Sequence, residues 1–290
     1  MNGILLIDKP SGWTSSDVVV KLKGVLHERR IGHSGTLDPM ATGLLMLFAG
    51  RATRAVEFAE AHDKRYTAHL RLGVVTDTQD VTGAVISHCA QNVTQAQLES
   101  LLPRFTGAQQ QIPPMYSAIK VGGKKLYDIA RRGGEVERNP RSIVISDIRV
   151  LGCDGGDWVL DVRCSKGTYI RTLCHDIGQA LGCGGCMSAL RRTEIGGIPV
   201  THAHTLEAVI AAAAAGTAEE LLIPVDSLWA ALPEYRADEA RTRRIKCGNE
   251  IKTPALPDGD YRVYSECGEF LMLGRALGGV MKTVKSFFEV

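Results

Sequence analysis

Residues 30–43 read Arg-Ile-Gly-His-Ser-Gly-Thr-Leu-Asp-Pro-Met-Ala-Thr-Gly, and this stretch decides how the rest of the chain is interpreted. From Gly32 to Gly43 it combines three glycines and a proline with small polar residues, which is typical of a shaped loop. The apolar run Leu44–Ala49 that follows predicts a buried strand. Asp38 is therefore expected on a loop that leads directly into the core.

Two interpretations of Asp38 are open on these residues. In the first, Asp38 caps a helix and Pro39 occupies the first helical position. In the second, the glycines let the backbone approach a ligand closely and His33 supplies a donor beside a functional carboxylate. A phosphate-binding P-loop is excluded, because the segment lacks the Gly-Lys-Ser/Thr that ends such loops.

The elements on either side of this loop are punctuated by turns. Residues 3–8 form a short apolar run that predicts a strand, and Lys9-Pro10-Ser11-Gly12 predicts the turn after it. A helix follows, capped by Ser15 or Ser16 and apolar at helical spacing as far as Leu26. Beyond the loop, residues 66–72 alternate in polarity as a half-buried strand does, and the polar residues 76–80 end it.

A second anomaly lies in the helix expected after the alternating strand 158–164. Thr168 is the predicted cap of this helix, and Ile170, Leu173 and their successors form its apolar stripe. Arg171 then falls in the first turn, where the helix dipole disfavours a cation. A nearby anion, either Asp38 or an RNA phosphate, would relieve the conflict; a solvated arginine is the alternative.

Strands and helices alternate without a regular βαβ period, which predicts an α+β fold with a mixed or antiparallel sheet. The alanine run 211–215 predicts a helix that ends near Gly216. A chain of 290 residues predicts a large domain and a smaller one. Past Leu232-Pro233 the pieces become short and strand-like, so we expect domains at 1–232 and 233–290.

The composition is that of an ordinary globular protein, with 44% hydrophobic and 23% charged residues. No apolar run is long enough to cross a bilayer and no signal peptide is recognisable, so a cytoplasmic protein is expected. The eight cysteines are expected to be free thiols. Cys183 and Cys186 with His202 and His204 imitate a zinc finger, but the histidine spacing is too short, and we expect no metal.

Basic residues gather in clusters although the formal net charge is only +2. Such clusters suit a phosphate backbone, and solvated surfaces are the ordinary alternative. Tyr66 likewise has two interpretations: a core aromatic residue, or a ring that stacks on a base if it borders a cleft. The basic clusters are Lys120, Lys124, Lys125, Arg131, Arg132, Arg138 and Arg141; Arg191 and Arg192; and Arg241, Arg243, Arg244 and Lys246.

Six ordered motifs together resemble the bacterial tRNA pseudouridine-55 synthases of the TruB type, and the resemblance spans most of the chain. The motifs are residues 3–12 (GILLIDKPSG); residues 30–43; Lys64-Arg-Tyr66 with Leu72-Gly73 and Thr76-Asp-Thr-Gln-Asp80; Pro114-Met-Tyr-Ser-Ala-Ile-Lys120 with Lys125-Leu-Tyr127; Cys164-Ser-Lys-Gly-Thr-Tyr-Ile-Arg-Thr-Leu173; and Leu190-Arg-Arg192.

The resemblance implies a fold, a substrate and a set of site residues. The fold is a central mixed, mainly antiparallel sheet with flanking helices, followed by a small β-barrel of the PUA type that binds RNA. The substrate is the T-loop uridine 55 of tRNA, which is converted to pseudouridine after base flipping. The enzyme is expected to be a monomer that uses no metal or organic cofactor and needs neither a membrane nor an obligate protein partner. By resemblance, Asp38 is the nucleophile, Arg171 its partner and Tyr66 the stacking ring, and the substrate contacts are His33, Lys9, Tyr169 and Leu190.

The chemistry is consistent with these residues. Isomerising uridine breaks a C–N bond and makes a C–C bond without redox change, and a carboxylate nucleophile divides that reaction into two steps. An adjacent guanidinium keeps the carboxylate ionised and in line, which would explain both Asp38 and Arg171. That Tyr66 takes a proton is a hypothesis. The competing functions are an RNA-binding or tRNA-folding module with a structural carboxylate, and a small-molecule phosphate enzyme.

Overall fold

The central sheet of the computed structural model, which describes residues 1–90 and 92–289, is mixed and mainly antiparallel. Every neighbouring pair in it is antiparallel except β3 and β12, which run parallel. The predicted sheet type is confirmed. In spatial order the strands are β1 (Gly3–Lys9), β3 (Thr42–Ala49), β12 (Gly185–Ile195), β4 (Lys64–Leu72), β11 (Asp157–Cys164), β10 (Arg141–Asp154) and β7 (Gly107–Gln111), with β2 (Ile31–Ser34) on β3 and β13 (Ile198–Pro199) on β12.

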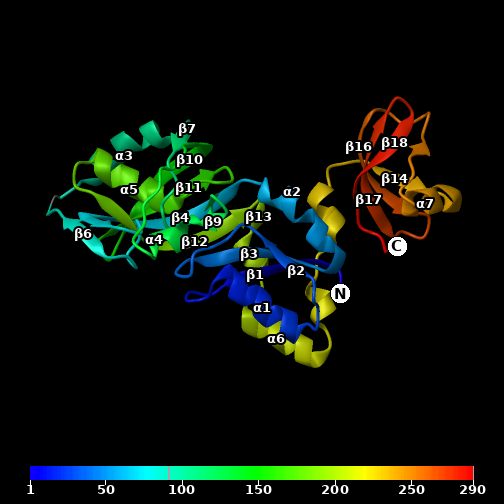
Figure 1. The fold of residues 1–290 in the computed structure, drawn as a ribbon, viewed down its shortest axis with the longest axis horizontal. Helices are drawn as coiled ribbons and strands as arrows, with labels where there is room; N and C mark the ends of the chain where they lie inside the picture. Colours follow the sequence, from blue (N-terminus) through cyan, green and yellow to red (C-terminus); the bar gives the residue numbers. More distant parts are fainter. Residues whose placement is uncertain (91, 290) are drawn as a thin grey trace.

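Helices cover the sheet in three places (Figure 1). Helix α5 (Ile170–Ala180) and helix α3 (Gln95–Leu101) bury their apolar stripes with the inward residues of β4, β10, β11 and β12. Helices α1 (Ser15–Val25) and α6 (Leu206–Ala215) pack with β1 and β3 in a second core. The other face of β1 and β3 is covered by η1 (Gly50–Ala55) and α2 (Val56–Glu60).

Two helix starts differ from the sequence predictions. Helix α1 is capped by Thr14, whose hydroxyl accepts from the Asp17 backbone N–H at 3.0 Å while the Asp17 carboxylate accepts from Thr14 N–H at 2.8 Å. This reciprocal capping box satisfies two otherwise free donors, so the predicted caps Ser15 and Ser16 are wrong. Helix α5 has Tyr169 at its N-cap, one residue after the predicted Thr168.

The segment around Asp38 also differs from the prediction. Residues 31–34 form strand β2 on β3, so His33 lies on a strand rather than in a loop. No helix begins at Asp38: residues 35–41 are an irregular connection with a turn at 39–40. The interpretation of Asp38 as a helix cap is therefore wrong, because the pairing of β2 with β3 forces the chain to reverse direction here.

Gly43 explains part of the glycine content of this segment. Its φ is +99°, and a Cβ there would lie 2.3 Å from the backbone oxygen of Arg192. The glycine thus lets β3 approach β12 closely, whereas the sequence suggested only close approach to a ligand.

The remaining elements of the large domain are short. The predicted helix at the alanine run is confirmed as α6, and it ends at Gly216 with φ +77°. The side chains of Lys120 and Lys125, in one predicted basic cluster, lie outside the described residues. The short elements are β5 (Val74–Thr76), β6 (Val85–His88), η2 (Leu102–Phe105), β8 (Lys120–Val121), β9 (Lys124–Lys125), α4 (Leu126–Ala130), η3 (Val200–His202), η4 (Ala218–Leu221) and η5 (Val225–Trp229).

The C-terminal part forms a separate five-stranded sheet with its own core, as the strand-like texture of the sequence predicts. Trp229 joins it to the large domain: its ring lies 5.2 Å from Phe58 of α2 and 5.7 Å from Phe287. The sequence did not predict helix α7, which Asp238 caps. The strands lie in the order β14 (Glu234–Ala237), β16 (Gly259–Ser265), β17 (Phe270–Leu277), β18 (Val280–Ser286) and β15 (Ile251–Lys252), with α7 (Glu239–Lys246) beside them. Among the described residues, no helix is long and apolar enough to span a membrane.

Candidate active site

The loop that carries Asp38 is held to the start of the chain by hydrogen bonds on both sides of the carboxylate. The Pro39 carbonyl accepts from the Gly12 N–H at 2.8 Å and from Lys9 Nζ at 3.3 Å. On the other side, the Ser15 hydroxyl accepts from Leu37 N–H at 2.9 Å. Because its neighbours on both sides are fixed, the backbone of Asp38 has little freedom.

Lys9 is fully buried, and its ammonium group donates hydrogen bonds to backbone carbonyls. Besides Pro39, it donates to the carbonyls of Pro10 at 2.8 Å and Trp13 at 2.7 Å. Burial lowers the pKa of Lys9 to about 8, and the nearby Asp38 carboxylate opposes that shift. Lys9 thus shapes the Asp38 loop from beneath, and its bonds to three carbonyls leave no free donor for a substrate.

Arg171 approaches Asp38 from α5 and pairs with both of its carboxylate oxygens. Arg171 Nε lies 2.9 Å from Asp38 Oδ2, and Nη2 donates to Oδ1 at 3.3 Å. The structure therefore brings together the two residues that sequence analysis marked as anomalous. This pairing supplies the anion that an arginine in a first helical turn requires.

The rest of the guanidinium is directed at residues to which sequence analysis assigned no role, although they lie in two of the six motifs. Nη1 donates to the Thr78 carbonyl at 3.1 Å and lies 3.8 Å from Asp80 Oδ2, and Nη2 also donates to the Tyr116 carbonyl at 2.9 Å. Four of the five N–H groups thus have a hydrogen-bond acceptor and Asp80 supplies a nearby charge, which together fix the plane of the guanidinium. Asp80 is buried and its other oxygen accepts from Thr82 N–H at 2.9 Å.

Exposure separates the two members of the pair. The side chain of Arg171 is 6% exposed, whereas that of Asp38 is 34% exposed. Burial raises the pKa of Asp38 above its usual value, and the Arg171 guanidinium acts in the opposite direction. The site therefore presents one accessible carboxylate whose geometry is set by a buried cation.

Tyr66 lies on β4 in the core cluster that also contains Leu37 and Leu190. The Asp38 carboxylate acts electrostatically on the Tyr66 phenol, so the ring lies near the carboxylate loop. Burial raises the pKa of the Tyr66 phenol, and a hydrogen bond from Arg192 opposes that shift. The hydroxyl therefore stays protonated at neutral pH, which does not favour the hypothesis that Tyr66 takes a proton.

His33 and Tyr169 lie at the edges of this arrangement. No described contact joins His33 to Asp38; its Nδ1 is buried without a hydrogen-bond partner, and burial and the charge of Arg192 lower its pKa. The described residues thus show no hydrogen bond from His33 to the carboxylate, and its contact with substrate stays a prediction. At the start of α5, the backbone N–H and carbonyl of Tyr169 both bond to the Gln111 side chain.

Of the predicted phosphate contacts, Arg192 is buried inside the protein and Arg191 is engaged in an ion pair. Arg192 is 1% exposed and donates to the carbonyls of Leu44 at 2.6 Å and Gly35 at 3.1 Å, so it supports the fold rather than a surface. Its inward direction follows from strand alternation, since Leu190 also faces the core and Arg191 between them pairs with Asp8 at 2.7 Å.

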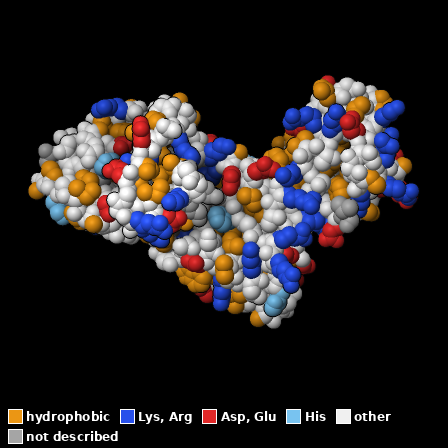
Figure 2. Space-filling view, viewed as in Figure 1, with side chains coloured by type: hydrophobic (Ala, Val, Ile, Leu, Met, Phe, Trp, Pro, Cys, Tyr) orange, Lys and Arg blue, Asp and Glu red, His pale blue; other side chains and the backbone are white. Residues whose placement is uncertain are grey.

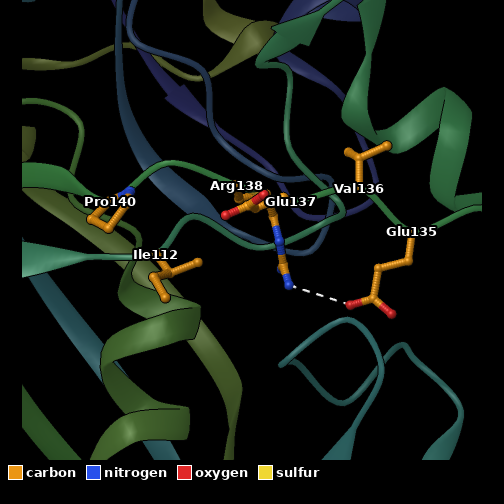
Figure 3. A pocket seen from close by; sticks show the side chains of 6 residues that line it. All are labelled: Ile112, Glu135, Val136, Glu137, Arg138 and Pro140. Carbon is orange, nitrogen blue, oxygen red and sulfur yellow. Dashed lines mark hydrogen bonds and ion pairs between the residues drawn. The ribbon is translucent and has the colours of Figure 1, made fainter.

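The surface also carries other basic side chains, and a cavity lies apart from Asp38. Figure 2 shows Lys and Arg side chains on several parts of one face, including the hollow between the two domains. A cavity of about 520 Å³ lies at the end of β7 (Figure 3), and no candidate catalytic residue lines it. Its lining residues are Ile112, Glu135, Val136, Glu137, Arg138 and Pro140. Within residues 1–90 and 92–289, no group of His, Cys, Asp or Glu is arranged to hold a metal ion.

Family models match most of the chain. Residues 23–170 match the N-terminal domain of TruB family pseudouridylate synthases, and residues 171–230 match the tRNA pseudouridylate synthase B C-terminal domain. A curated relative from Azoarcus sp., named tRNA pseudouridine synthase B, is 44% identical over 282 residues, covering 97% of this chain and 93% of the relative. One of the same name from Ralstonia pickettii is 46% identical over 270 residues, covering 91% and 85%.

Solved structures show a similar fold. A crystal structure of a Cbf5-Nop10-Gar1 complex contains a chain with 26% identity and a TM-score of 0.74, matching 99% of this chain and 85% of that one. The structure of an H/ACA RNP bound to a substrate RNA containing 2'-deoxyuridine gives the same TM-score at 24% identity.

Proposed function

Because this chain belongs to the TruB family of pseudouridylate synthases, we propose that it isomerises uridine 55 in the T-loop of tRNA to pseudouridine, with Asp38 as the nucleophile. The observation that carries the proposal is the accessible Asp38 carboxylate paired through both oxygens with the buried Arg171. Neither a structural helix cap nor a solvated ion pair has this geometry.

The reaction needs Asp38 ionised and aimed. Arg171 favours the ionised form against the burial that raises the pKa of Asp38. The two bonds from one rigid guanidinium also fix the plane of the carboxylate, so an oxygen is presented to the substrate in one direction. Attack by that oxygen forms a covalent intermediate and divides the exchange of a C–N bond for a C–C bond into two steps.

The target base must leave the T-loop before Asp38 can reach the nucleotide. Extrusion costs a few kcal/mol, and stacking of the uracil on Tyr66 offsets part of this. Leu190, opposite Ala68 on the neighbouring strand, belongs to the same core cluster as Tyr66, and we assign it an apolar contact with the base. We assign His33 to the opened loop through the half-exposed part of its ring, and Tyr169, the N-cap of α5, to a further substrate contact.

The large domain, residues 1–232, is proposed to carry catalysis, and residues 233–290 to form a PUA-like RNA-binding domain. The separate core of the C-terminal sheet and the end of the family match at residue 230 support this boundary. We propose no metal or organic cofactor for the reaction, since the isomerisation involves no redox change. We also propose a monomer in the cytoplasm, without an obligate protein partner.

The proposal is tested by incubating the pure protein with unmodified tRNA and mapping pseudouridine chemically. We expect modification at uridine 55 and none in a tRNA that carries cytidine there. An unmodified product, or modification confined to other positions, contradicts the proposal. The RNA-binding alternative predicts bound tRNA without any conversion.

A further inference from the structure

A single hydroxyl holds the residue before the proposed nucleophile. Ser15 Oγ accepts from Leu37 N–H at 2.9 Å and lies 3.3 Å from the Leu37 carbonyl, to which it donates. Ser15 is 1% exposed, and Thr14 performs the capping of α1, so the Ser15 hydroxyl is not required at the helix end. Like a neighbouring strand, it bonds both the N–H and the carbonyl of one residue, Leu37, which lies 22 residues away in sequence.

A single carboxamide holds the helix start before the partner arginine in the same way. Gln111 Oε1 accepts from Tyr169 N–H at 2.8 Å, and Gln111 Nε2 donates to the Tyr169 carbonyl at 3.1 Å. Gln111 is 5% exposed and ends β7, so its side chain continues the hydrogen-bond pattern of the strand onto α5. Tyr169 has no side-chain cap of its own, and Arg171 follows two residues later.

The two contacts restrain opposite members of one ion pair. Figure 1 shows α1, which carries Ser15, and the β7–α5 region on different sides of the domain. Asp38 and Arg171 are 133 residues apart in sequence, so no local structure sets their distance. Each is instead positioned by a buried side chain that binds both backbone polar groups of a nearby residue.

We propose that Ser15 and Gln111 are positioning residues of the proposed reaction, which align Asp38 and Arg171 through the backbones of Leu37 and Tyr169. We call the two contacts the Ser15 and Gln111 backbone clamps. Catalytic groups must be held close to their productive geometry, and a displacement of about 1 Å can lower a rate about 100-fold. Both clamp side chains are buried and spend their polar atoms on backbone, so tRNA affinity should not depend on them.

The test measures single-turnover rate, tRNA dissociation constant and thermal midpoint for Ser15→Ala and Gln111→Leu. Each variant is expected to lose about 10- to 100-fold in rate with tRNA affinity within about twofold of wild type. Two matched controls lose a comparable side-chain bond to a backbone carbonyl elsewhere: Ser188→Ala, which breaks a bond to His69, and Gln109→Leu, which breaks one to Phe105. Their rates should equal the wild-type rate.

The double variant distinguishes positioning from a loss of stability. Once one member of the pair is displaced, releasing the other adds little, so Ser15→Ala with Gln111→Leu should be about as slow as the slower single variant. If the two substitutions instead caused independent structural defects, the fold-losses in rate of the single variants would multiply in the double variant. Ser15→Thr, which keeps the hydroxyl, should recover most of the rate even if the added methyl lowers the thermal midpoint.

The inference rests on the proposed function, and the outcomes separate the two. If wild type makes no pseudouridine, the proposed function fails. If wild type is active and the clamp variants match their controls in rate, or lose rate only in proportion to folded protein, the clamps are structural and this inference alone is overturned. Should Ser15→Ala not fold, the rate of Gln111→Leu compared with that of its control Gln109→Leu decides in the same way.

Discussion

Replacing Arg171 by methionine tests the energetic core of the site. The substitution keeps an apolar stem of similar length but removes all five donors. It leaves the Asp38 and Asp80 carboxylates and the carbonyls of Thr78 and Tyr116 without their cationic partner. Removing one partner of a buried pair costs about 3–5 kcal/mol. Because Asp38 stays partly in water, we expect the lower end, about 3 kcal/mol of the free energy of unfolding.

The control is an ion pair with the same two-bond geometry at the surface. Arg275 lies 2.6 and 2.9 Å from the oxygens of Asp260, but its side chain is 63% exposed. Water and salt screen such an exposed pair, so Arg275→Met should unfold at a urea concentration close to that of the wild type.

Urea unfolding followed by circular dichroism measures both variants. Arg171→Met should lower the thermal midpoint by roughly 6–12 °C in parallel scans, at about 2–4 °C per kcal/mol. The loss of stability in Arg171→Met should become smaller in acid, because protonation of Asp38 removes the unpaired charge. Equal losses in the two arginine variants, or a deficit that does not depend on pH, would refute the assignment of Arg171 as the buried partner of Asp38.

Three further outcomes follow from the same geometry. Burial raises the pKa of Asp38, so kcat/KM should fall as the pH decreases through that pKa. In Arg171→Met, where the opposing guanidinium is gone, the acid limb of the pH–rate profile should move to higher pH. An acid limb that does not move contradicts the pairing. Tyr66→Phe should keep most of the single-turnover rate whereas Tyr66→Ala loses about 1–3 kcal/mol of stacking, roughly 5- to 150-fold; equal losses would assign the role to the hydroxyl instead of the ring. Burial lowers the pKa of Lys9 from an ordinary 10.5 to about 8 in the folded state, so between these pH values the folded state binds fewer protons than the unfolded state. The stability of the wild type relative to Lys9→Met should therefore rise with pH across that window, as urea titrations at about pH 7.5 and 10 would show. A difference that does not change with pH contradicts burial of the ammonium group.

The fold was predictable wherever one face of an element is buried. The alternation from Tyr66 to Leu72 and from Trp158 to Cys164 marked strands β4 and β11, because side-chain period follows burial in a sheet. The same rule, applied to Leu190, Arg191 and Arg192, would have assigned Arg192 to the core from its sequence position alone. Grouping the two arginines as one basic cluster overlooked that rule.

The site was predictable only where a residue is awkward in its own element. Arg171 in a first helical turn pointed to a nearby anion, and the structure provides Asp38. Asp80 gave no such sign, since an aspartate in a polar loop is ordinary. Ser15 was interpreted as a helix cap, which is the local role its position suggests, and only the tertiary contact with Leu37 shows otherwise. Gln111 acts over 58 residues of sequence and carries no local signal.

The most direct test of the account is a comparison of Asp38→Asn with wild type in single-turnover conversion of tRNA. Asparagine keeps the shape of the side chain and an acceptor for Arg171, but it is not a nucleophile. We expect tRNA affinity within about threefold of wild type, since the contacts of the surrounding loop remain, and no detectable pseudouridine at uridine 55. Pseudouridine formation by Asp38→Asn at a substantial fraction of the wild-type rate would contradict the claim that this carboxylate carries the reaction.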